Sequence, residues 1–419
     1  MRLSVARVGI ASLTALALAA GLSACGASTK GPTTLNWYVF PEPSGSFAKA
    51  ASDCTASSHG AYRININLLS TSSDQQRVSL VRRLAAGDPS IDIIAMDVDW
   101  TAEFATAKWI RPWTGANAAA VTGGVLPGPL QTAKFKGTLY GAPLNSNTQL
   151  LWYRTDLVPK PPKTWDQMID DAIQLAKEGK PHYIEEQGAK YEGLTVWFNS
   201  LVNSAGGGIV SPDNRILIGP SAEVAARIMK RLGTSVVADP GLNVAQESQA
   251  DTAFDKGGAA FEINYPFVWG SAQKTGPAVF KHMGYAPFPQ AIAGTAPRVS
   301  IGGFNLAVST YSKHPQQAFA AVRCLVNRNN QLRDAVKGGL APVLASVYSD
   351  AAFVKANPFS TIMKTQLTNY GLRPQTPAYA DVTRAIQDNL QPAADVDPPG
   401  IVSKLRSQIK AALSSKALL

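Results

Sequence analysis

Acidic and amide side chains stand at the ends of predicted strands, where they could contact a small ligand. In open α/β sheets, ligands bind beyond the carboxyl ends of the strands. Carboxylate acceptors, amide donors and nearby aromatic rings suit a polyhydroxylated ligand, because paired polar groups bind neighbouring hydroxyls while a ring covers an apolar face. Helix capping or a loop role is the alternative for each acid. The polar residues in these positions are Glu42, Asp97, Asp99, Asn145 and Asn147.

Catalytic and metal-binding motifs are absent from the sequence. It contains no Gly-x-Ser-x-Gly elbow, no phosphate loop ending in Gly-Lys-Ser/Thr and no His-Glu-x-x-His. The four histidines are isolated and have no ligand spacing, so we expect no zinc site and no cofactor. Carboxylate pairs of the kind that glycosidases use could still be formed. Such pairs would come from Asp97, Asp99, Glu247 and Glu262.

The polar residues named above would be positioned by predicted strands and helices, of which the first form a strand–helix–strand unit. A helix is predicted between the second and third strands because Val78, Val81 and Leu84 recur at helical intervals. The third strand is a continuous apolar run, as expected of a strand buried on both faces. The N-terminal part is therefore predicted to be an α/β domain with a parallel sheet. The predicted strands cover residues 34–40, 62–69 and 91–97.

A second domain is predicted to begin after residue 157. Three prolines between 159 and 162 forbid regular structure there, and Thr164 is a suitable cap for the amphipathic helix that follows. Residues 283–290 are predicted to cross between the two domains. Residues 304–309 are predicted to form a strand that returns to the first sheet. From His314 onward helical patterns dominate.

The N-terminus has the pattern of a secretory signal. Arg2 and Arg7 precede an apolar stretch that ends in Leu-Ser-Ala-Cys at Cys25. That ending resembles a bacterial lipobox, in which cleavage precedes a cysteine that carries a lipid. We therefore expect a signal peptide over 1–24, and a lipidated Cys25 with a polar tether over 25–33. An ordinary cleaved signal with an accidental cysteine is the alternative.

The mature chain would have 419 minus 24, or 395 residues, which is long for one core and suggests two domains.

Outside the cytoplasm, Cys54 and Cys324 are expected to form one disulfide, although two separate buried thiols are the alternative. The net charge of +10 falls to +8 without Arg2 and Arg7. Because the positive residues are scattered, no nucleic-acid binding is expected.

Ordered segments of the sequence resemble a known family. The chain is similar to the extracytoplasmic sugar-binding proteins of ABC importers, of the maltose/trehalose-binding type, over almost all of its mature length. It most resembles the trehalose-binding lipoproteins of mycobacteria and related actinobacteria. The segments that carry the resemblance are YGAPLNSNTQLLWYRTDL, FDKGGAAFEINYPF, GYAPFP, IGGFNLAVS, HPQQAFAAVRCL, DVDWTAEFA and GLRPQTPAY.

The resemblance implies an α/β fold of the two-lobed, type II periplasmic-binding-protein kind, with a sugar held between the lobes and delivered by hinge closure. Lobe 1 would comprise 34–143 plus 285–325, and lobe 2 would comprise 144–284 plus 326–419. Chain crossings are expected near 143–147, 284–288 and 310–326. The implied partners are a permease with a cytoplasmic ATPase, and the membrane through a lipid anchor; the protein is expected to be a monomer.

The resemblance also assigns ligand contacts. Tyr265 replaces the tryptophan usual in the trehalose binders, which keeps a stacking face and adds a hydroxyl. Gly303 is included because its missing side chain would let a ligand approach the backbone, and Trp197 has a core position as its alternative. The contacts carried over are Asp97, Asn147, Glu247, Tyr265 and Arg373, followed by the lining candidates Gln76, Glu42, Asn145, Trp197 and Gly303.

Three hypotheses of function follow from these observations. The leading one is a lipid-anchored protein, held at the outer face of the cell membrane, that captures trehalose or a related α-glucoside for import and performs no chemistry. Maltose or another oligosaccharide is the alternative ligand. A secreted glycosidase with two carboxylates and a surface adhesin that binds glycans are the competing classes.

Overall fold

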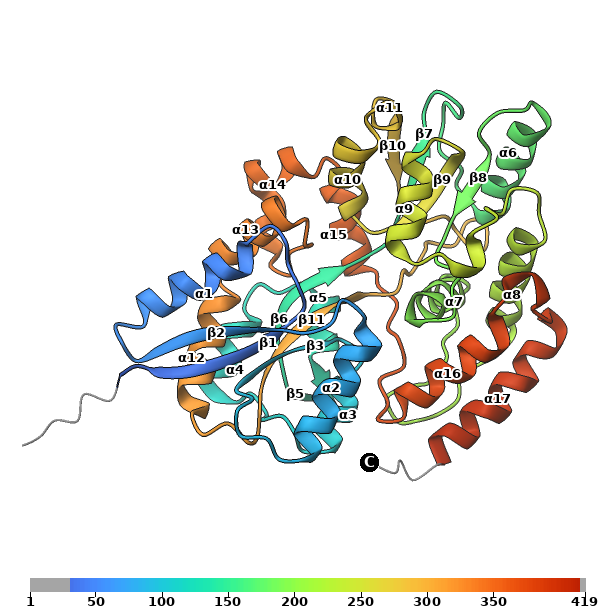
Figure 1. The fold of residues 1–419 in the computed structure, drawn as a ribbon. Helices are drawn as coiled ribbons and strands as arrows, with labels where there is room; N and C mark the ends of the chain where they lie inside the picture. Colours follow the sequence, from blue (N-terminus) through green and yellow to red (C-terminus); the bar gives the residue numbers. More distant parts are fainter. Residues whose placement is uncertain (1–30, 415–419) are drawn as a thin grey trace, which may run out of the picture. The chain divides into compact units, whose positions relative to one another are not determined.

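Two β-sheets organise the chain in the computed structural model, which describes residues 31–414. The first sheet has the strand order β2, β1, β3, β11, β6, and the second has the order β10, β7, β9, β8 (Figure 1). The strands of the first sheet are β1 (Thr33–Val39), β2 (Tyr62–Leu68), β3 (Ile93–Asp97), β6 (Ala142–Asn147) and β11 (Gly302–Val308). Those of the second are β7 (Leu150–Arg154), β8 (Tyr183–Glu185), β9 (Ala259–Asn264) and β10 (Met283–Ala286).

The first sheet confirms the strand–helix–strand unit that was predicted for the N-terminal part of the chain. Strands β1, β2 and β3 are parallel, and the helix between β2 and β3 is α2 (Ser73–Ala85). Strand β11 is antiparallel to both β3 and β6, so a late segment returns to the first sheet as expected. The segment predicted as a crossing begins with β10, which pairs with β7 of the second sheet before the chain passes on.

Both faces of the first sheet are buried, which explains the continuous apolar run in β3. Alternate side chains of a strand face opposite ways. Leu35 and Trp37 join one core cluster with α1 (Ser46–Ser57) and α12 (Pro315–Leu325), whereas Tyr38 joins another beneath α2 and α3 (Thr101–Thr106). Burial of each large apolar side chain contributes about 1.5–3 kcal/mol. The remaining elements that pack around this sheet are α4 (Gly115–Thr122), α5 (Pro127–Thr132), β4 (Lys134–Phe135) and β5 (Thr138–Leu139).

A disulfide joins Cys54 of α1 to Cys324 of α12. The two helices contact each other on one face of the first sheet. The predicted pairing is confirmed, and with it the return of the chain to its first sheet. Because 270 residues separate the two cysteines in the sequence, the bond constrains a long stretch of the unfolded chain.

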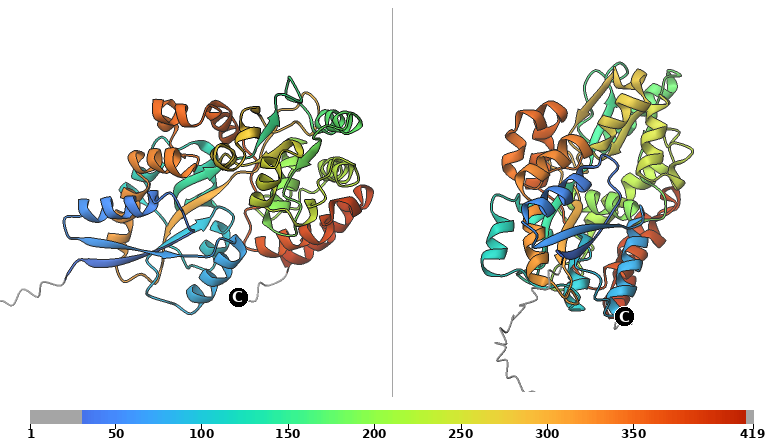
Figure 2. Two further views of the ribbon diagram at one scale, coloured as in Figure 1. Left: turned by 45° about the horizontal axis from the view of Figure 1, so that its top comes forward. Right: turned by 60° about the vertical axis from the view of Figure 1, so that its left-hand side comes forward.

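Helices surround the second sheet. Thr164 caps α6 as predicted, because its hydroxyl accepts a hydrogen bond from the Gln167 amide. Trp165 and Trp197 lie fully buried in the core that these helices enclose. Figure 2 shows the last two helices packed together beside α8, in agreement with their contacts. The helices are α6 (Trp165–Lys177), α7 (Glu192–Ser204), α8 (Pro220–Gly233), α9 (Glu247–Asp255), α10 (Phe267–Thr275), α11 (Pro277–Phe280), α16 (Tyr379–Leu390) and α17 (Pro398–Ser414), with short turns η1 (Leu242–Val244) and η3 (Ala393–Asp395).

Three further α-helices and one short 3-10 helix lie between β11 and α16. Helix α13 contacts α1, and α15 contacts α5, so this segment packs against elements of the first sheet. A shared apolar cluster also joins it to Trp152 and Phe254 of the second sheet's side. These helices therefore connect the two halves. They are α13 (Arg328–Gly338), η2 (Ala345–Ser349), α14 (Ala351–Ala356) and α15 (Ser360–Thr368).

Candidate functional site

A cavity of about 460 Å³ lies between the two halves of the described chain. Its wall combines strand ends of the first sheet with residues that follow the second sheet and with the segment between α15 and α16. This volume falls within the range of ~300–1,000 Å³ that small-molecule sites occupy. Six of the residues predicted as ligand contacts line it: Asp97, Asn147, Glu247, Tyr265, Gly303 and Arg373.

The topology of the first sheet brings three of these residues together. Strands β3 and β6 end where β11 begins, because β11 is antiparallel to both. Asp97 is therefore paired with Phe304, and Asn147 with Gly302. The cavity lies at the carboxyl ends of β3 and β6, which is where ligands bind in open α/β sheets.

Gly303 has a structural requirement of its own. Its φ of +120° lies in a region that favours glycine, and a Cβ atom there would lie 2.3 Å from the carbonyl oxygen of Asn145. From the sequence, the missing side chain of this glycine was expected to let a ligand approach the backbone. The residue does line the cavity, but the neighbouring strand β6 already demands the missing side chain.

In the second half, Asn264 positions two of the candidate contacts. Its buried amide group donates to the Glu247 carbonyl oxygen at 2.9 Å and to Glu262 Oε1 at 2.6 Å. Its Oδ1 accepts from the backbone N–H of Tyr265 at 2.8 Å. Asn264 thus ties the start of α9 to the residue that follows β9. Glu262, which lies fully buried in the strand, orients this amide and does not line the cavity.

Arg373 lies at the centre of a buried ion cluster. Its Nη2 donates to Asp97 Oδ1 at 2.8 Å, while its Nη1 donates to Glu192 Oε1 at 2.8 Å and to Asp99 Oδ2 at 3.1 Å. Arg373 is only 6% exposed. Its Nε is buried and has no hydrogen-bond partner among residues 31–414.

The charges in this cluster shift one another's protonation. Burial, assisted by the charge of Asp97, raises the pKa of Asp99 well above its ordinary value, although Arg373 opposes the shift. Burial also raises the pKa of Glu192 against the opposing charge of Arg373. Burial disfavours the Arg373 cation, but Asp99 and Asp97 outweigh that effect and raise its pKa. A charged guanidinium therefore faces two carboxyl groups, those of Asp99 and Glu192, whose pKa values burial raises.

Three helices begin at the cavity, and each presents an acid in its first turn. The acids are Asp74 in α2, Glu192 in α7 and Glu247 in α9. The partial positive charge at a helix N-terminus stabilises such a carboxylate by about 0.3–1 kcal/mol when it is exposed. For Glu247, burial dominates and raises the pKa.

Tyr191 and Tyr265 are the aromatic residues with hydroxyl groups on this wall. Burial, followed by the charge of Glu247, raises the pKa of both phenols, so both remain protonated donors at neutral pH. The buried Tyr191 hydroxyl interacts with the Glu247 carboxyl group and partly offsets the rise that burial causes in the pKa of that group. The ring lies over Gly193, where a Cβ atom would come within 2.1 Å of that hydroxyl.

Tyr191, Glu192 and Gly193 line the cavity but were not predicted from the sequence as ligand contacts. They follow β8, a strand of three residues that pairs in parallel with β9. The rule that placed Asp97 would have found them, since they also stand beyond the carboxyl end of a parallel strand. The strand was too short and too polar for its pattern to be recognised. The other cavity residues that were missed include Ser72, Ser73, Asp74, Lys190 and Gln246.

Four predicted lining residues lie outside the set that lines this cavity. Gln76 donates to the Ser70 carbonyl oxygen, and Glu42 accepts from the Ser44 and Ser46 amides before α1. Asn145 is buried in β6, paired with Phe304. Trp197 is fully buried and packs against Trp165. It therefore has the core position that the sequence analysis gave as the alternative to ligand contact.

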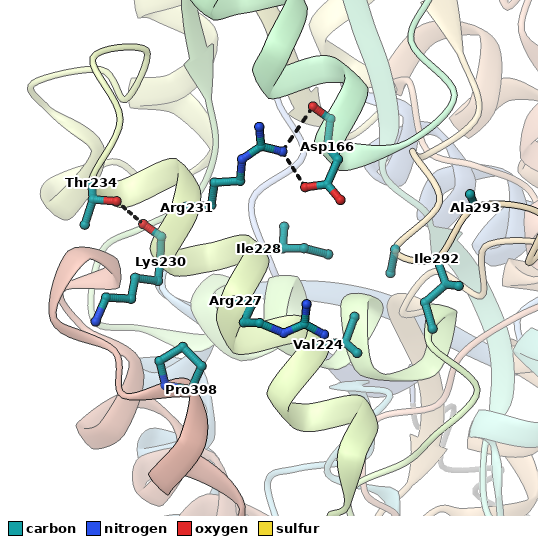
Figure 3. Close-up of a pocket in the computed structure, with 11 residues that line it drawn as sticks. Asp166, Val224, Arg227, Ile228, Lys230, Arg231, Thr234, Ile292, Ala293 and Pro398 are labelled. Carbon is teal, nitrogen blue, oxygen red and sulfur yellow. Dashed lines mark hydrogen bonds and ion pairs between the residues drawn. The ribbon is translucent and has the colours of Figure 1, made fainter.

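A larger hollow, of about 710 Å³, lies on one side of the second half (Figure 3). Arg231 spans part of it and forms ion pairs with Asp166 and Asp170 of α6. Its floor is aliphatic, and its lining includes no aromatic side chain and a single acid, Asp166. The interlobe cavity is smaller, but its converging carboxylates, amide and phenols make it the stronger candidate for a binding site.

Residues 31–414 contain no group of His, Cys, Asp or Glu side chains arranged to hold a metal ion. Within the same range, no helix is long and apolar enough to cross a membrane.

Comparison with known proteins identifies the family. The model of the bacterial extracellular solute-binding protein family matches residues 59–332, which is more than half of the chain. This chain belongs to that family. A probable ABC transporter-binding protein of Deinococcus radiodurans is 31% identical to this solute-binding protein over 317 residues, which cover 73% of this chain and 74% of the relative.

Solved structures share the fold of this solute-binding protein. The maltose-bound MalE3 of T. maritima superimposes with a TM-score of 0.81 at 24% identity, over 91% of this chain and all of that one. The GacH receptor of Streptomyces glaucescens gives a TM-score of 0.76 at 19% identity, over 92% of this chain and 99% of that one. The predicted fold class is confirmed: the chain is a two-lobed type II solute-binding protein.

Family membership also bears on activity and location. The family binds solutes and performs no catalysis, in agreement with the prediction that this chain is not an enzyme. Its members act outside the cytoplasm, which agrees with the secretory signal expected at the N-terminus. The signal peptide and Cys25 themselves lie outside the described residues.

Proposed function

We propose that this protein captures a disaccharide, trehalose foremost, in the cavity between its lobes and delivers it to the permease of an ABC importer. The convergence of six expected sugar contacts on one interlobe cavity carries this proposal. Carboxylates and the Arg373 N–H would bind vicinal hydroxyls, while the Tyr265 ring would cover an apolar sugar face. Maltose or another oligosaccharide is the alternative ligand.

The relatives support a sugar ligand. The first solved neighbour carries maltose, and the GacH receptor has been solved with acarbose. The Deinococcus relative bears the description of an ABC transporter-binding protein, which supports a permease and ATPase as partners. The segments in which the chain resembles the trehalose-binding lipoproteins favour trehalose.

The anchoring and the lobe boundaries belong to the same proposal. Lipidation of Cys25 would hold the monomer at the outer face of the cell membrane, next to its permease. Lobe 1 would comprise residues 34–143 plus 285–325, and lobe 2 would comprise 144–284 plus 326–419. Hinge motion at the crossings between them would close the cavity over the sugar.

Substitutions in the cavity test the proposal. Glu247→Gln should weaken sugar binding about tenfold or more, because hydrogen bonds to a charged group contribute about 1.5–3 kcal/mol. Tyr265→Ala should weaken it through loss of the ring face. Glu178→Gln on the exposed end of α6 is the matched control and should bind like the unaltered protein. Unchanged affinity in both cavity variants would overturn the assigned site.

A further inference from the structure

Four carboxyl groups meet where helix α9 packs on the second sheet. Glu262 of β9 is fully buried and is paired in register with Glu185 of the parallel strand β8. Asp251 and Asp255 belong to α9, which contacts β9. Burial, followed by the charge of Asp251, raises the pKa of Glu262 well above its ordinary value, and Glu185 and Asp255 add to the effect. The interface therefore brings several acids to one place.

No positive side chain compensates these acids. Among residues 31–414, none of the four forms an ion pair, and Arg154 on the neighbouring strand β7 is paired with Asp156 instead. Lys256 after α9 and Lys274 of α10 are exposed. In the same range, the acids do not converge as the ligands of a metal ion would. A buried carboxyl group without a counter-charge is favoured in its neutral form.

Glu262 is the most enclosed of the four acids. Its Oε1 accepts a hydrogen bond from the Asn264 amide at 2.6 Å, while its buried Oε2 has no hydrogen-bond partner in the described part of the chain. Asp251 is less enclosed, and its Oδ2 accepts from the Ser271 hydroxyl at 2.6 Å. Ionised Glu262 and Glu185 would repel each other across adjacent strands, which lie about 4.8 Å apart. Because it accepts a single hydrogen bond, Glu262 is favoured as the neutral acid.

Asn264 connects Glu262 to the sugar cavity. Both N–H bonds of its amide are used, one on Glu262 Oε1 and the other on the Glu247 carbonyl oxygen at 2.9 Å. Its Oδ1 accepts from the Tyr265 N–H at 2.8 Å, and its carbonyl oxygen accepts from the Trp152 indole at 3.0 Å. Glu247 and Tyr265 line the cavity, whereas Glu262 and Asn264 do not. A change at Glu262 therefore reaches two cavity residues without any contact to a ligand.

Ionisation of Glu262 would disturb this arrangement through α9. The carboxylate would keep its hydrogen bond to Asn264 but would repel Asp251, which lies one helical turn after Glu247. Displacement of α9 would then draw the Glu247 carbonyl oxygen away from the amide.

We propose that Glu262 is a positioning residue of the sugar site that carries a proton, and that the uncharged acid keeps Glu247 and Tyr265 in place through Asn264. The inference rests on the proposed function, since the two positioned residues are proposed sugar contacts.

Two substitutions of Glu262, compared by calorimetric titration with trehalose and maltose at neutral pH, test the positioning role. Glu262→Gln keeps an acceptor for Asn264 and has no charge, so it should bind like the unaltered protein. Glu262→Ala removes the acceptor and should weaken affinity about fivefold or more. Val279→Ala truncates a buried side chain of the core that includes Phe254 of α9, and Val279 does not line the cavity. This control for lost packing should also bind like the unaltered protein.

Infrared spectroscopy tests the proton itself and needs no sugar. The C=O stretching band of protonated carboxyl groups should be weaker in Glu262→Gln than in the unaltered protein. Asp213→Asn is the control, because hydrogen bonds from Ser211 and Arg215 lower the pKa of this exposed acid, and it should leave the band unchanged. A band of equal strength in Glu262→Gln would overturn the assigned proton.

The affinities separate this inference from the proposed function. If the unaltered protein binds a sugar and Glu262→Ala binds it equally well, the positioning role falls and the proposed function stands. The same conclusion follows if Glu262→Gln or Val279→Ala loses as much affinity as Glu262→Ala. If neither sugar binds to the unaltered protein, the proposed function falls and the positioning role falls with it.

Discussion

Arg373 Nη1 lies 2.8 Å from Glu192 Oε1, and this contact joins the segment before α16 to the first turn of α7. The same guanidinium reaches Asp97 at the end of β3 in the first lobe. One buried cation thus connects carboxylates from both lobes at the wall of the cavity. The arrangement makes Arg373 a structural centre of the interface as well as a candidate ligand contact.

Removal of this cation should destabilise the protein strongly. Arg373→Ala would leave Asp97, Asp99 and Glu192 without their shared partner, and breaking a buried pair in this way costs about 3–5 kcal/mol. Urea denaturation should show that loss in the free energy of unfolding. Arg215→Ala, which removes an exposed ion pair with Asp213, is the control and should cost less than about 1 kcal/mol. Similar small losses in both variants would contradict the assigned role.

A methyl group at Gly193 should impair binding without unfolding α7. The Cβ of Gly193→Ala would lie 2.1 Å from the Tyr191 hydroxyl and would push that ring from its place on the cavity wall. Gly270→Ala in α10 is the matched control, because nothing lies within 4 Å of its Cβ and alanine favours helix by roughly 0.5–1 kcal/mol. Titration with sugar should show weakened affinity for the first variant only. Equal affinity in both would mean that Tyr191 does not contribute.

Stability should fall as pH rises from about 5 to 8. Burial, followed by the charge of Asp239, raises the pKa of Glu185 from 4.5 to about 8. Within that window the folded protein retains a proton that the unfolded chain has released, so the free energy of unfolding decreases with pH by up to about 1.4 kcal/mol per unit for this group. Denaturation of Glu185→Gln across the window should give a shallower slope.

The matched control for this pH dependence is Glu178→Gln. Its carboxyl group is exposed, and hydrogen bonding from Lys180 lowers its pKa, so it is ionised throughout the window. The slope of this variant should equal that of the unaltered protein. If the free energy of unfolding of Glu185→Gln also changes with pH as steeply as that of the unaltered protein, Glu185 ionises normally in the folded state.

Reduction of the disulfide should lower stability and spare binding. Cys54 and Cys324 join α1 to α12, and neither cysteine lines the cavity. A double Cys→Ser variant should lose about 2–4 kcal/mol of unfolding free energy, and dithiothreitol should destabilise only the unaltered protein. If the reductant has no effect on the unaltered protein, the bond does not form.

Much of the fold was predictable because its determinants are local. The strand at 93–97 is a buried apolar run, and the cap at Thr164 precedes a clear amphipathic helix. The contacts carried by resemblance also converged: Asp97 and Arg373, 276 residues apart, meet at 2.8 Å. Neither periodicity nor spacing could have shown that meeting, since it depends on how the lobes pack.

The rest of the site could not be predicted from the sequence for a physical reason. Glu192 and Asp74 are ordinary first-turn acids, and nothing in their local sequence distinguishes a helix that begins at a cavity from one that begins in solvent. Trp197 shows the reverse, since a residue considered as a ligand contact from the sequence is buried in the core. Burial by distant segments determines which role such residues take.

Calorimetric titration of the purified protein with a panel of sugars tests the central claim most directly. We predict saturable binding of one trehalose per chain, tighter than maltose, and an affinity about tenfold or more lower in Glu247→Gln. Strong binding of another sugar without any heat from trehalose would contradict the assigned ligand, and the absence of binding to every sugar would contradict the function itself.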